Sequence, residues 1–320
     1  MAGKTVNITV KGKRVPLPAF DFQDKVIAVR GTVPKIAFIH DEWWLERELE
    51  DPEACLAALK QLRSSGFRAD ILTFAPKVPG SHPKYSYHSE MDSIAAARTS
   101  NFKEWWESLP QESRKNVRRS QKRGVLVEVK KFDDELINGI MGVNNDSSVR
   151  QGGRNAHYGK PFDEVKKDHE SFLDRSDFIC AVADNTIIGY LKLVYKGDVA
   201  ALLNLAVKPS ETDKRPANAL MAKAVELCEQ KGVQFLTYGM FNYGNKRDSP
   251  LREFKIRNGF AEVLTPRYFV PLTPVGSLAM KMGLHRGLLG ILPNQAITWG
   301  LKTRARWYNF KSSLAGVAQR

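Results

Sequence analysis

Short apolar runs separated by polar turns fill the first hundred positions and predict strands around one helix. Strands are predicted at 5–10, 25–31 and 35–40, because each run is short and rich in β-branched residues. Residues 51–67 have helical spacing, with Asp51 as a suitable N-cap and Pro52 in the first helical position. A strand is predicted at 69–76, and the Pro-, Gly- and His-rich segment 77–89 is predicted to be a loop.

After Thr99 the pattern predicts a longer series of helices and strands. In chain order these are helices at 101–109 and 111–124, a strand at 125–132, helices at 133–146 and 161–175, strands at 177–184, 186–195 and 199–207, a helix at 215–232, a strand at 233–240, a helix at 249–259 and a strand at 260–272. Asp184 and Asn185 mark a tight hairpin turn. The order favours a mixed α/β sheet covered by helices, with a ligand site at strand ends beside a helix N-terminus.

Three segments of this series also have recognisable motifs. They are the basic helix with its following strand at 113–129, the helix of small residues with its glycine-ended strand at 215–240, and the sequence EFKIRNGF at 253–260. In this order they resemble the catalytic half of the Fem-type peptidyl transferases and their acyl-CoA-using relatives, within the GNAT acyltransferase fold. The resemblance covers residues 65 to 275.

The resemblance implies an α/β fold of the GNAT acyl-CoA N-acyltransferase type with a smaller N-terminal GNAT-like half. We therefore expect residues 1–98 to form an N-terminal α/β half, interpreted as a degenerate GNAT-like unit. Residues 99–272 would form the catalytic domain, and residues 273–320 a basic, apolar C-terminal extension.

Two positions depart from the family pattern. Thr237 stands two residues before Gly239, where the family usually has an aspartate. In the loop that holds coenzyme A in GNAT enzymes, Ala217 replaces the first glycine and Pro216 removes one backbone donor.

Acyl transfer to an amine needs a held donor, a stabilised oxyanion and a route for a proton. The resemblance implies acyl-CoA as co-substrate, with no permanently bound cofactor. A strand ending at Val207 can expose backbone groups to the pantetheine chain, and the next helix start can meet a pyrophosphate. The predicted donor-binding residues are Val207, Lys214, Arg215, Ala217, Asn218 and Ala219.

Lys255 and Tyr243 are the predicted catalytic residues. The resemblance implies that Lys255 stabilises the oxyanion, and the alternative is a lysine whose stem lies along the core while its ammonium stays in water. Tyr243 is interpreted as a general acid for the leaving thiolate, or else as a packed aromatic residue. The residues alone indicate no side-chain base.

Acceptor recognition is predicted in the segment 147–162, where two glycines allow an unusual backbone path. The candidate acceptor-binding residues are Arg150, Arg154, His157 and Tyr158 in that segment, together with Asn204 and Tyr238. A surface loop without a role in binding is the alternative. No metal is expected, because His82 and His88 lack acidic or thiol companions in their loop.

The net charge of +14 is unevenly distributed. No acidic residue follows Glu262, whereas eight lysines and arginines do, and residues 111–124 hold six more. Such surfaces attract nucleic acid, anionic lipid or phosphorylated substrates, or they are simply solvated. Three widely spaced cysteines suit a reducing compartment, and no apolar run is long enough to span a membrane. We expect a cytoplasmic protein whose tail can contact the inner face of an anionic membrane.

Three functions remain open at this stage. The first is an acyl-CoA-dependent N-acyltransferase that serves a cell-envelope or polysaccharide precursor. The second is a transferase that uses aminoacyl-tRNA as donor, and the third is a non-catalytic GNAT-fold binding module. The sequence names neither the acyl group, the acceptor nor the oligomeric state.

Overall fold

The computed structural model describes residues 4–10, 13–40, 49–80, 82–150, 153–242 and 249–286. Twelve strands form one sheet in the order β1-β2-β3-β4-β5-β14-β6-β13-β12-β11-β10-β7. Their bounds are β1 Lys4–Val10, β2 Lys13–Phe22, β3 Lys25–Arg30, β4 Ile36–Ile39, β5 Ile71–Phe74, β6 His88–Arg98, β7 Leu126–Lys130, β10 Ser176–Ala183, β11 Thr186–Lys196, β12 Val199–Val207, β13 Phe235–Met240 and β14 Ala261–Pro271. A two-stranded ribbon, β8 Val149–Arg150 and β9 Gly153–Arg154, stands apart.

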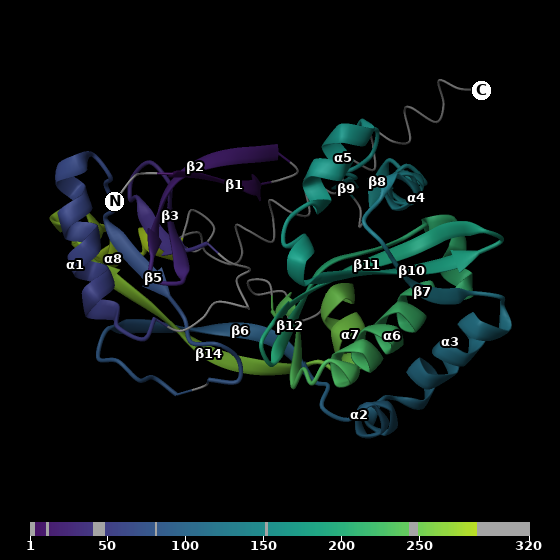
Figure 1. Ribbon diagram of the computed structural model, residues 1–320. Coiled ribbons are helices and arrows are strands. Elements are labelled where there is room, and N and C mark those ends of the chain that lie inside the picture. The colour runs from purple at the N-terminus through teal and green to yellow at the C-terminus, as the bar shows by residue number, and fades with distance from the viewer. Residues whose placement is uncertain are drawn as a thin grey trace.

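Eight α-helices cover this sheet in the described part of the chain. They are α1 Pro52–Leu62, α2 Phe102–Ser108, α3 Gln111–Lys122, α4 Asp134–Asn144, α5 Phe162–His169, α6 Pro216–Gln230, α7 Pro250–Arg257 and α8 Pro274–Lys281. Figure 1 shows α1 and α8 beside the N-terminal strands, α4 and α5 on one side of the β10–β12 region, and α2, α3, α6 and α7 on the other. The mixed α/β class predicted from the sequence is confirmed, and none of the described helices is long and apolar enough to cross a membrane.

The last strand joins the two halves of the molecule. β14 pairs with β5 of the N-terminal half (β1–β5 and α1) through Tyr268–Pro271, and with β6 of the C-terminal half (β6, β7, β10–β13 and α2–α7) along Ala261–Phe269. One sheet therefore runs through both halves. A side chain on β6 or β14 can contact residues of either half.

Apolar residues on both faces of this sheet explain why the helices pack there. On the face under α6, Leu220, Met221 and Leu236 are fully buried in one core. On the opposite face, Leu136 and Ile140 of α4 pack on Tyr190. Burial of this apolar surface is the main force that holds the helices to the sheet.

Several local predictions are confirmed and others were wrong. Asp184 and Asn185 form the predicted hairpin turn, with φ of 49° and 56°, as such a turn requires. The predicted helix 161–175 is interrupted: α5 ends at His169 and Phe172 has φ of 55°.

Strand β6 was missed, and the predicted loop 77–89 runs into it. Its centre contains alanines and a serine, which have weak strand propensity. The pairing of β6 with β13 on one side and β14 on the other overrides that propensity.

Candidate functional site

Strands β12 and β13 separate and leave an open edge inside the sheet. They pair in parallel only where Val199–Ala201 meet Phe235–Thr237. Among the described residues, β12 pairs with β11 alone from Leu202 to Val207, so its main-chain groups on the β13 side lack a strand partner there. The Thr237 hydroxyl donates to the Ala200 carbonyl at 3.1 Å, and so ties the two strands together just before they part. An extended ligand with amide groups can bind such an edge as an added strand.

The N-terminus of α6 lies directly after this open edge. A 3-10 turn, Pro209–Lys214, connects β12 to Arg215, whose φ of 57° places it in the left-handed region, and α6 begins at Pro216. No side chain of the described residues caps the helix, and one bond of the three-residue type, from the Asn218 amide to the Arg215 carbonyl at 3.2 Å, precedes the regular helix pattern. Uncapped N–H groups at the positive end of a 15-residue helix attract phosphate.

The two cations predicted beside this helix start have different surroundings. Lys214 contacts Glu211 at 2.9 Å and Asp184 at 3.4 Å, and its pKa is raised, first by the hydrogen bond with Glu211. The two carboxylates offset its charge, so Lys214 is less suited to phosphate than the sequence indicated. Arg215 is exposed at the cap position itself and is the better candidate.

Lys255 is fully buried, so its ammonium does not stay in water as the alternative interpretation required. Its Nζ donates to the Met240 carbonyl at 2.6 Å and lies 4.8 Å from the centre of the Tyr238 ring. Burial lowers the pKa of Lys255 to about 8. Near neutral pH it is therefore a poorly solvated cation, which can stabilise a developing oxyanion strongly.

Local geometry explains how Lys255 reaches the end of β13. The hydroxyl of Ser249 caps α7 by accepting from the Arg252 amide at 3.1 Å, and this fixes the start of the helix that carries Lys255. Pairing between β13 and β6 skips Tyr238 and Gly239, and Gly239 has φ of 60°, which glycine adopts without strain. The turn at Gly239 precedes the Met240 carbonyl that Lys255 contacts.

The predicted acceptor segment is attached to the end of β12. Arg150 Nη2 donates to the carbonyls of Val143 at 3.0 Å and Val207 at 3.2 Å. Asp146 accepts from the amide of Ser210 at 3.0 Å and from its hydroxyl at 2.8 Å. The structure thus brings Arg150 and Val207 together, but it uses the Arg150 side chain to hold the backbone.

The other predicted acceptor-binding residues lie on several different elements. Arg154 and Tyr158 are exposed, and Asn204 is half-buried on β12 opposite Lys192. His157 is half-buried, and burial, followed by the charge of Lys160, lowers its pKa. Tyr238 lies under Lys255 and packs against Phe260 with ring centres 5.9 Å apart. Tyr243 lies outside the described residues.

Sequence reasoning missed a polar cluster after the end of β13. The side-chain amide of Asn242 donates to Glu262 Oε1 at 2.9 Å, the hydroxyl of Ser93 donates to the same oxygen at 2.5 Å, and Arg252 Nε donates to Asn242 Oδ1 at 3.1 Å. Glu262 on β14 supplies the carboxylate of this cluster and is a candidate base. The missed strand β6, which contributes Ser93, hid this cluster.

The surroundings of His88 also differ from the expectation. His88 Nε2 lies 3.4 Å from Glu90 Oε1, and His285 Nε2 lies 2.7 Å from the same oxygen. Ligand atoms of these three residues lie within 4.8 Å of one another. The reason given for expecting no metal, that His88 lacks an acidic companion, is therefore wrong.

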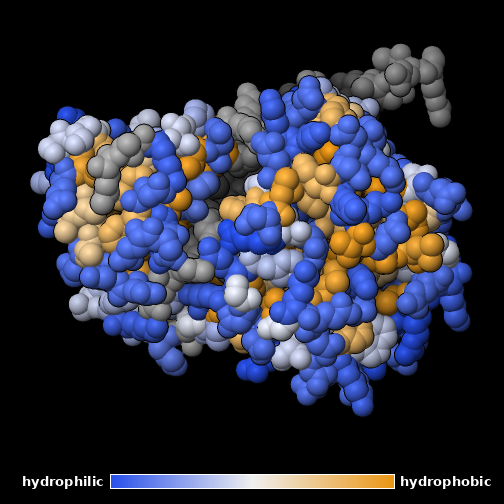
Figure 2. Space-filling model, viewed as in Figure 1, coloured by the Kyte–Doolittle hydropathy of each residue, from blue (hydrophilic) through white to orange (hydrophobic). Residues whose placement is uncertain are grey.

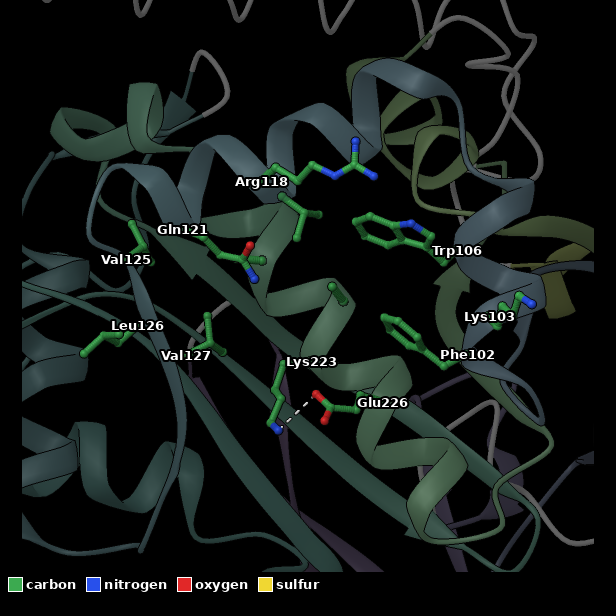
Figure 3. Close-up of a pocket in the computed structure, with 13 residues that line it drawn as sticks. Phe102, Lys103, Trp106, Arg118, Gln121, Val125, Leu126, Val127, Lys223 and Glu226 are labelled. Carbon is green, nitrogen blue, oxygen red and sulfur yellow. Dashed lines mark hydrogen bonds and ion pairs between the residues drawn. The ribbon is translucent and has the colours of Figure 1, made fainter.

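A groove of about 600 Å³ lies between α2, α3, β7 and α6 (Figure 3). Trp106 and Phe102 stack with ring centres 6.0 Å apart, and the Arg118 guanidinium lies 5.8 Å from the Trp106 ring. Figure 2 shows hydrophobic side chains among charged ones on this half of the molecule, and Leu126 at the start of edge strand β7 is 69% exposed. The groove contains neither Lys255 nor Arg215, but Ala219, a predicted donor-binding residue in the first turn of α6, lines its edge.

Comparison with known proteins agrees with this geometry. Residues 152–247 match the model of the acetyltransferase (GNAT) family, a stretch that includes β10–β13 and α6. Within the C-terminal half, this stretch is similar to a GNAT domain. Over 83 residues the chain is 31% identical to spermidine N(1)-acetyltransferase of Thermoplasma acidophilum. This alignment covers 26% of the chain and 49% of the relative, so the chain spans about half the length of the curated protein that it matches.

Two solved structures extend the likeness to most of the chain. FemX superposes with a TM-score of 0.56 and 13% identity, covering 88% of this chain and 90% of FemX. L-PGS from Bacillus licheniformis gives a TM-score of 0.55 and 14% identity, covering 86% and 89%. At such identities the likeness shows the fold alone. It confirms the GNAT-like and Fem-like resemblance noted in the sequence.

Proposed function

We propose that the protein is an N-acyltransferase that moves an acyl group from acyl-CoA to an amine acceptor. The observation that carries this proposal is the separation of β12 from β13, which ends at the uncapped start of α6. The open edge of β12 suits the amides of a pantetheine chain, and the helix start with Arg215 suits the pyrophosphate that follows it. The GNAT match over residues 152–247 supports the same assignment.

The reaction joins the acceptor nitrogen to the thioester carbonyl carbon and breaks the carbon–sulfur bond. Lys255, buried and contacting the Met240 carbonyl, would stabilise the oxyanion of the tetrahedral intermediate. Glu262 would accept the proton that the amine loses, directly or through water. The leaving thiolate takes up a proton, and Tyr243 remains the predicted donor of it.

For the acceptor, we propose an amine-bearing cell-envelope or polysaccharide precursor. The relative from Thermoplasma acidophilum is named for a polyamine, which supports an amine as the acceptor group. Arg150 and the ribbon β8–β9 would shape the acceptor entrance, because they are attached to the end of β12. Contact of the tail with an anionic membrane stays a prediction, since residues after Arg286 lie outside the described part of the chain.

Helix α3 gives some support to aminoacyl-tRNA as an alternative donor. Its buried face is formed by Ser113, Val117 and Ser120, so its cationic side chains are exposed or half-buried. A basic helix of this kind can follow a phosphate backbone, and such binding would weaken steeply with salt. The third possibility, a non-catalytic binding module, predicts no turnover with any donor.

A thermal-shift assay with acyl-CoA and with aminoacyl-tRNA separates these candidates. Coenzyme A at 100 times its dissociation constant is expected to stabilise the fold by about 2.7 kcal/mol. Release of free thiol from acetyl-CoA in the presence of an amine then tests turnover. Stabilisation by aminoacyl-tRNA alone would overturn the acyl-CoA assignment, and binding of coenzyme A without turnover would favour the binding module.

A further inference from the structure

A second, polar cavity of about 230 Å³ lies where the two halves meet, on the sheet surface formed by β3, β4, β5, β14 and β6. We call it the polar pocket. Its lining residues are Arg30, Ile36, Phe38, Thr73, Glu90, Asp92, Arg267, Phe269, His285 and Arg286. None of them takes part in the acyl-transfer site described above.

Most charged groups of the polar pocket are paired: of its three arginines, Arg267 and Arg286 contact its two carboxylates, and Arg30 lies 5.1 Å from the centre of the Phe38 ring. Arg267 Nε donates to Asp92 Oδ2 at 2.6 Å. Arg286 Nε contacts both oxygens of Glu90, at 2.9 and 3.1 Å, and His285 Nε2 lies 2.7 Å from Glu90 Oε1. Paired guanidinium and carboxylate groups hold each other in place and keep further hydrogen-bonding positions. Such a surface suits a neutral ligand with both donors and acceptors better than it suits an ion.

Buried polar atoms at the same surface have no hydrogen-bond partner among the described residues. They are the hydroxyls of Thr73 and Thr265 and the Nδ1 atom of His285. The three residues are 3%, 2% and 7% exposed, and Thr73 and His285 line the pocket. Thr265 shares a strand face with Arg267 and Phe269, because alternate residues of a strand point the same way. Unpaired buried polar atoms are costly and rare, so a ligand that bonds them would remove that cost.

Size and shape restrict this ligand to one ring-sized group. At about 30 Å³ per water, the cavity holds the volume of about eight waters. Aromatic rings form its apolar walls: Phe269 and His285 meet edge to face at 4.8 Å, and Phe38 stands near Arg30. We infer that the polar pocket binds a neutral, hydroxyl-rich ring of the pyranose kind, which forms part of the acyl acceptor.

Strand β6 connects this pocket to the transfer site. Glu90, Asp92 and Ile94 share one face of β6, whereas Ser93, which binds the proposed base Glu262, is on the other face. Ile94 pairs with Met240, whose carbonyl receives the bond from Lys255. At ~3.4 Å per residue, Asp92 lies about 7 Å and Glu90 about 14 Å along the strand from Ile94. This step rests on the proposed function: a ring held in the pocket would place an amine on the same molecule one or two ring lengths away, at the acyl carbonyl.

Binding of methyl glucoside, which has the ring but no amine, tests the inference without any acyl donor. Saturation-transfer NMR on the full chain should detect it with a dissociation constant in the millimolar range, as is usual for a fragment of this size. Thr73→Val should weaken binding roughly two- to tenfold, the range for one neutral hydrogen bond. The same substitution should leave the melting temperature of the free protein unchanged or higher, because it removes an unpaired buried hydroxyl.

Two further variants make this test selective. Thr265→Val should act in the same direction as Thr73→Val, and it serves if the latter does not fold. Thr186→Val, at the exposed β10–β11 turn, makes the same chemical change outside the pocket and should not alter binding. If Thr73→Val raises the melting temperature but leaves glucoside binding unchanged, the role of Thr73 is purely structural and the inference is overturned.

Other outcomes also decide the matter. Absence of glucoside binding overturns the inference, as does competition by inorganic phosphate, which would indicate an ionic site. Zinc chloride that binds through His88 and displaces the glucoside would assign the cluster to a metal instead. If the glucoside binds and coenzyme A does not, the ring site stands and the acyl-CoA assignment fails. If coenzyme A supports turnover and the glucoside does not bind, the ring site alone fails.

Discussion

Two parallel strand–helix–strand units, one in each half of the sheet, differ in a way that separates support from function. In the N-terminal half, β4 and β5 pair through Ile36–Phe38 and Ile71–Thr73, and β4 ends one residue later. In the C-terminal half, β12 continues for six residues beyond its last pair with β13. The N-terminal unit is therefore closed, whereas the C-terminal unit leaves a strand edge open to a ligand.

The helices of the two units differ in the same sense. Asp51 caps α1 by accepting from the Ala54 amide at 2.9 Å, so the helix supplies its own anion. In the described part of the chain, the start of α6 has no side-chain cap, and Arg215 occupies the cap position. A helix start that lacks its own cap is suited to bind a phosphate from a ligand. The comparison is consistent with the proposal that residues 1–98 are a degenerate GNAT-like unit, although the boundary of that unit stays a prediction.

The largest expected effect follows from removing the buried cation of the C-terminal half. Lys255→Met keeps most of the apolar stem, so the protein should fold, and turnover should fall roughly 10²–10³-fold, the range for one oxyanion donor. Lys25→Met is the matched control, because Lys25 is a buried lysine of the N-terminal half that contacts Asp24 at 2.7 Å. Steady-state kinetics of both variants should show a loss for Lys255 alone, and equal rates would remove Lys255 from catalysis.

The pH dependence of stability provides a second contrast. Burial lowers the pKa of Lys255 from 10.5 to about 8, so between these values the unfolded chain binds more protons than the folded one. Folding stability should therefore rise with pH across this window, by up to about 3 kcal/mol from this one group. Urea unfolding of wild type and Lys255→Met at pH 7.5 and 10 isolates the effect. Parallel changes in both proteins would contradict the buried, shifted lysine.

Giving α6 an acidic cap should make the C-terminal unit resemble the N-terminal one. Arg215→Asp removes a cation and adds a carboxylate where the pyrophosphate is proposed, and aspartate tolerates a positive φ better than most residues. Coenzyme A affinity, measured by calorimetry, should fall at least about tenfold, which is ~1.4 kcal/mol. Arg154→Asp makes the same charge change on an exposed residue of the acceptor segment and should affect coenzyme A binding little. Unchanged affinity in Arg215→Asp would place the phosphates elsewhere.

The smallest expected effect lies in the closed unit. Asp51→Ala removes the cap of α1 and should lower the free energy of unfolding by about 1 kcal/mol. Coenzyme A binding and turnover should remain at wild-type levels, because α1 lies in the other half. Chemical denaturation together with the coenzyme A titration checks both. A change in coenzyme A affinity would show that the two units are coupled, and the contrast between them would then fail.

Local sequence signals determined the elements whose formation depends on near neighbours. The Asp184–Asn185 turn, the Ser249 cap of α7 and the amphipathic stripe of α6 were readable because each depends on residues a few positions apart. The order of these elements was enough to indicate the GNAT-like fold.

Contacts between distant segments were decided only by the tertiary structure. Strand β6 forms because β13 and β14 pair with its two edges, against the weak strand propensity of its own residues. The hydrogen bond between Ser93 and Glu262 could not be predicted from the sequence, because the two residues are 169 positions apart. Lys214 looked like a phosphate ligand until folding placed Asp184 beside it, and Lys255 could be assigned to the buried interior only once α7 was packed on β13. Burial and contacts between distant residues set the electrostatic environment of these groups, and the pattern of residues along the sequence contains neither kind of information.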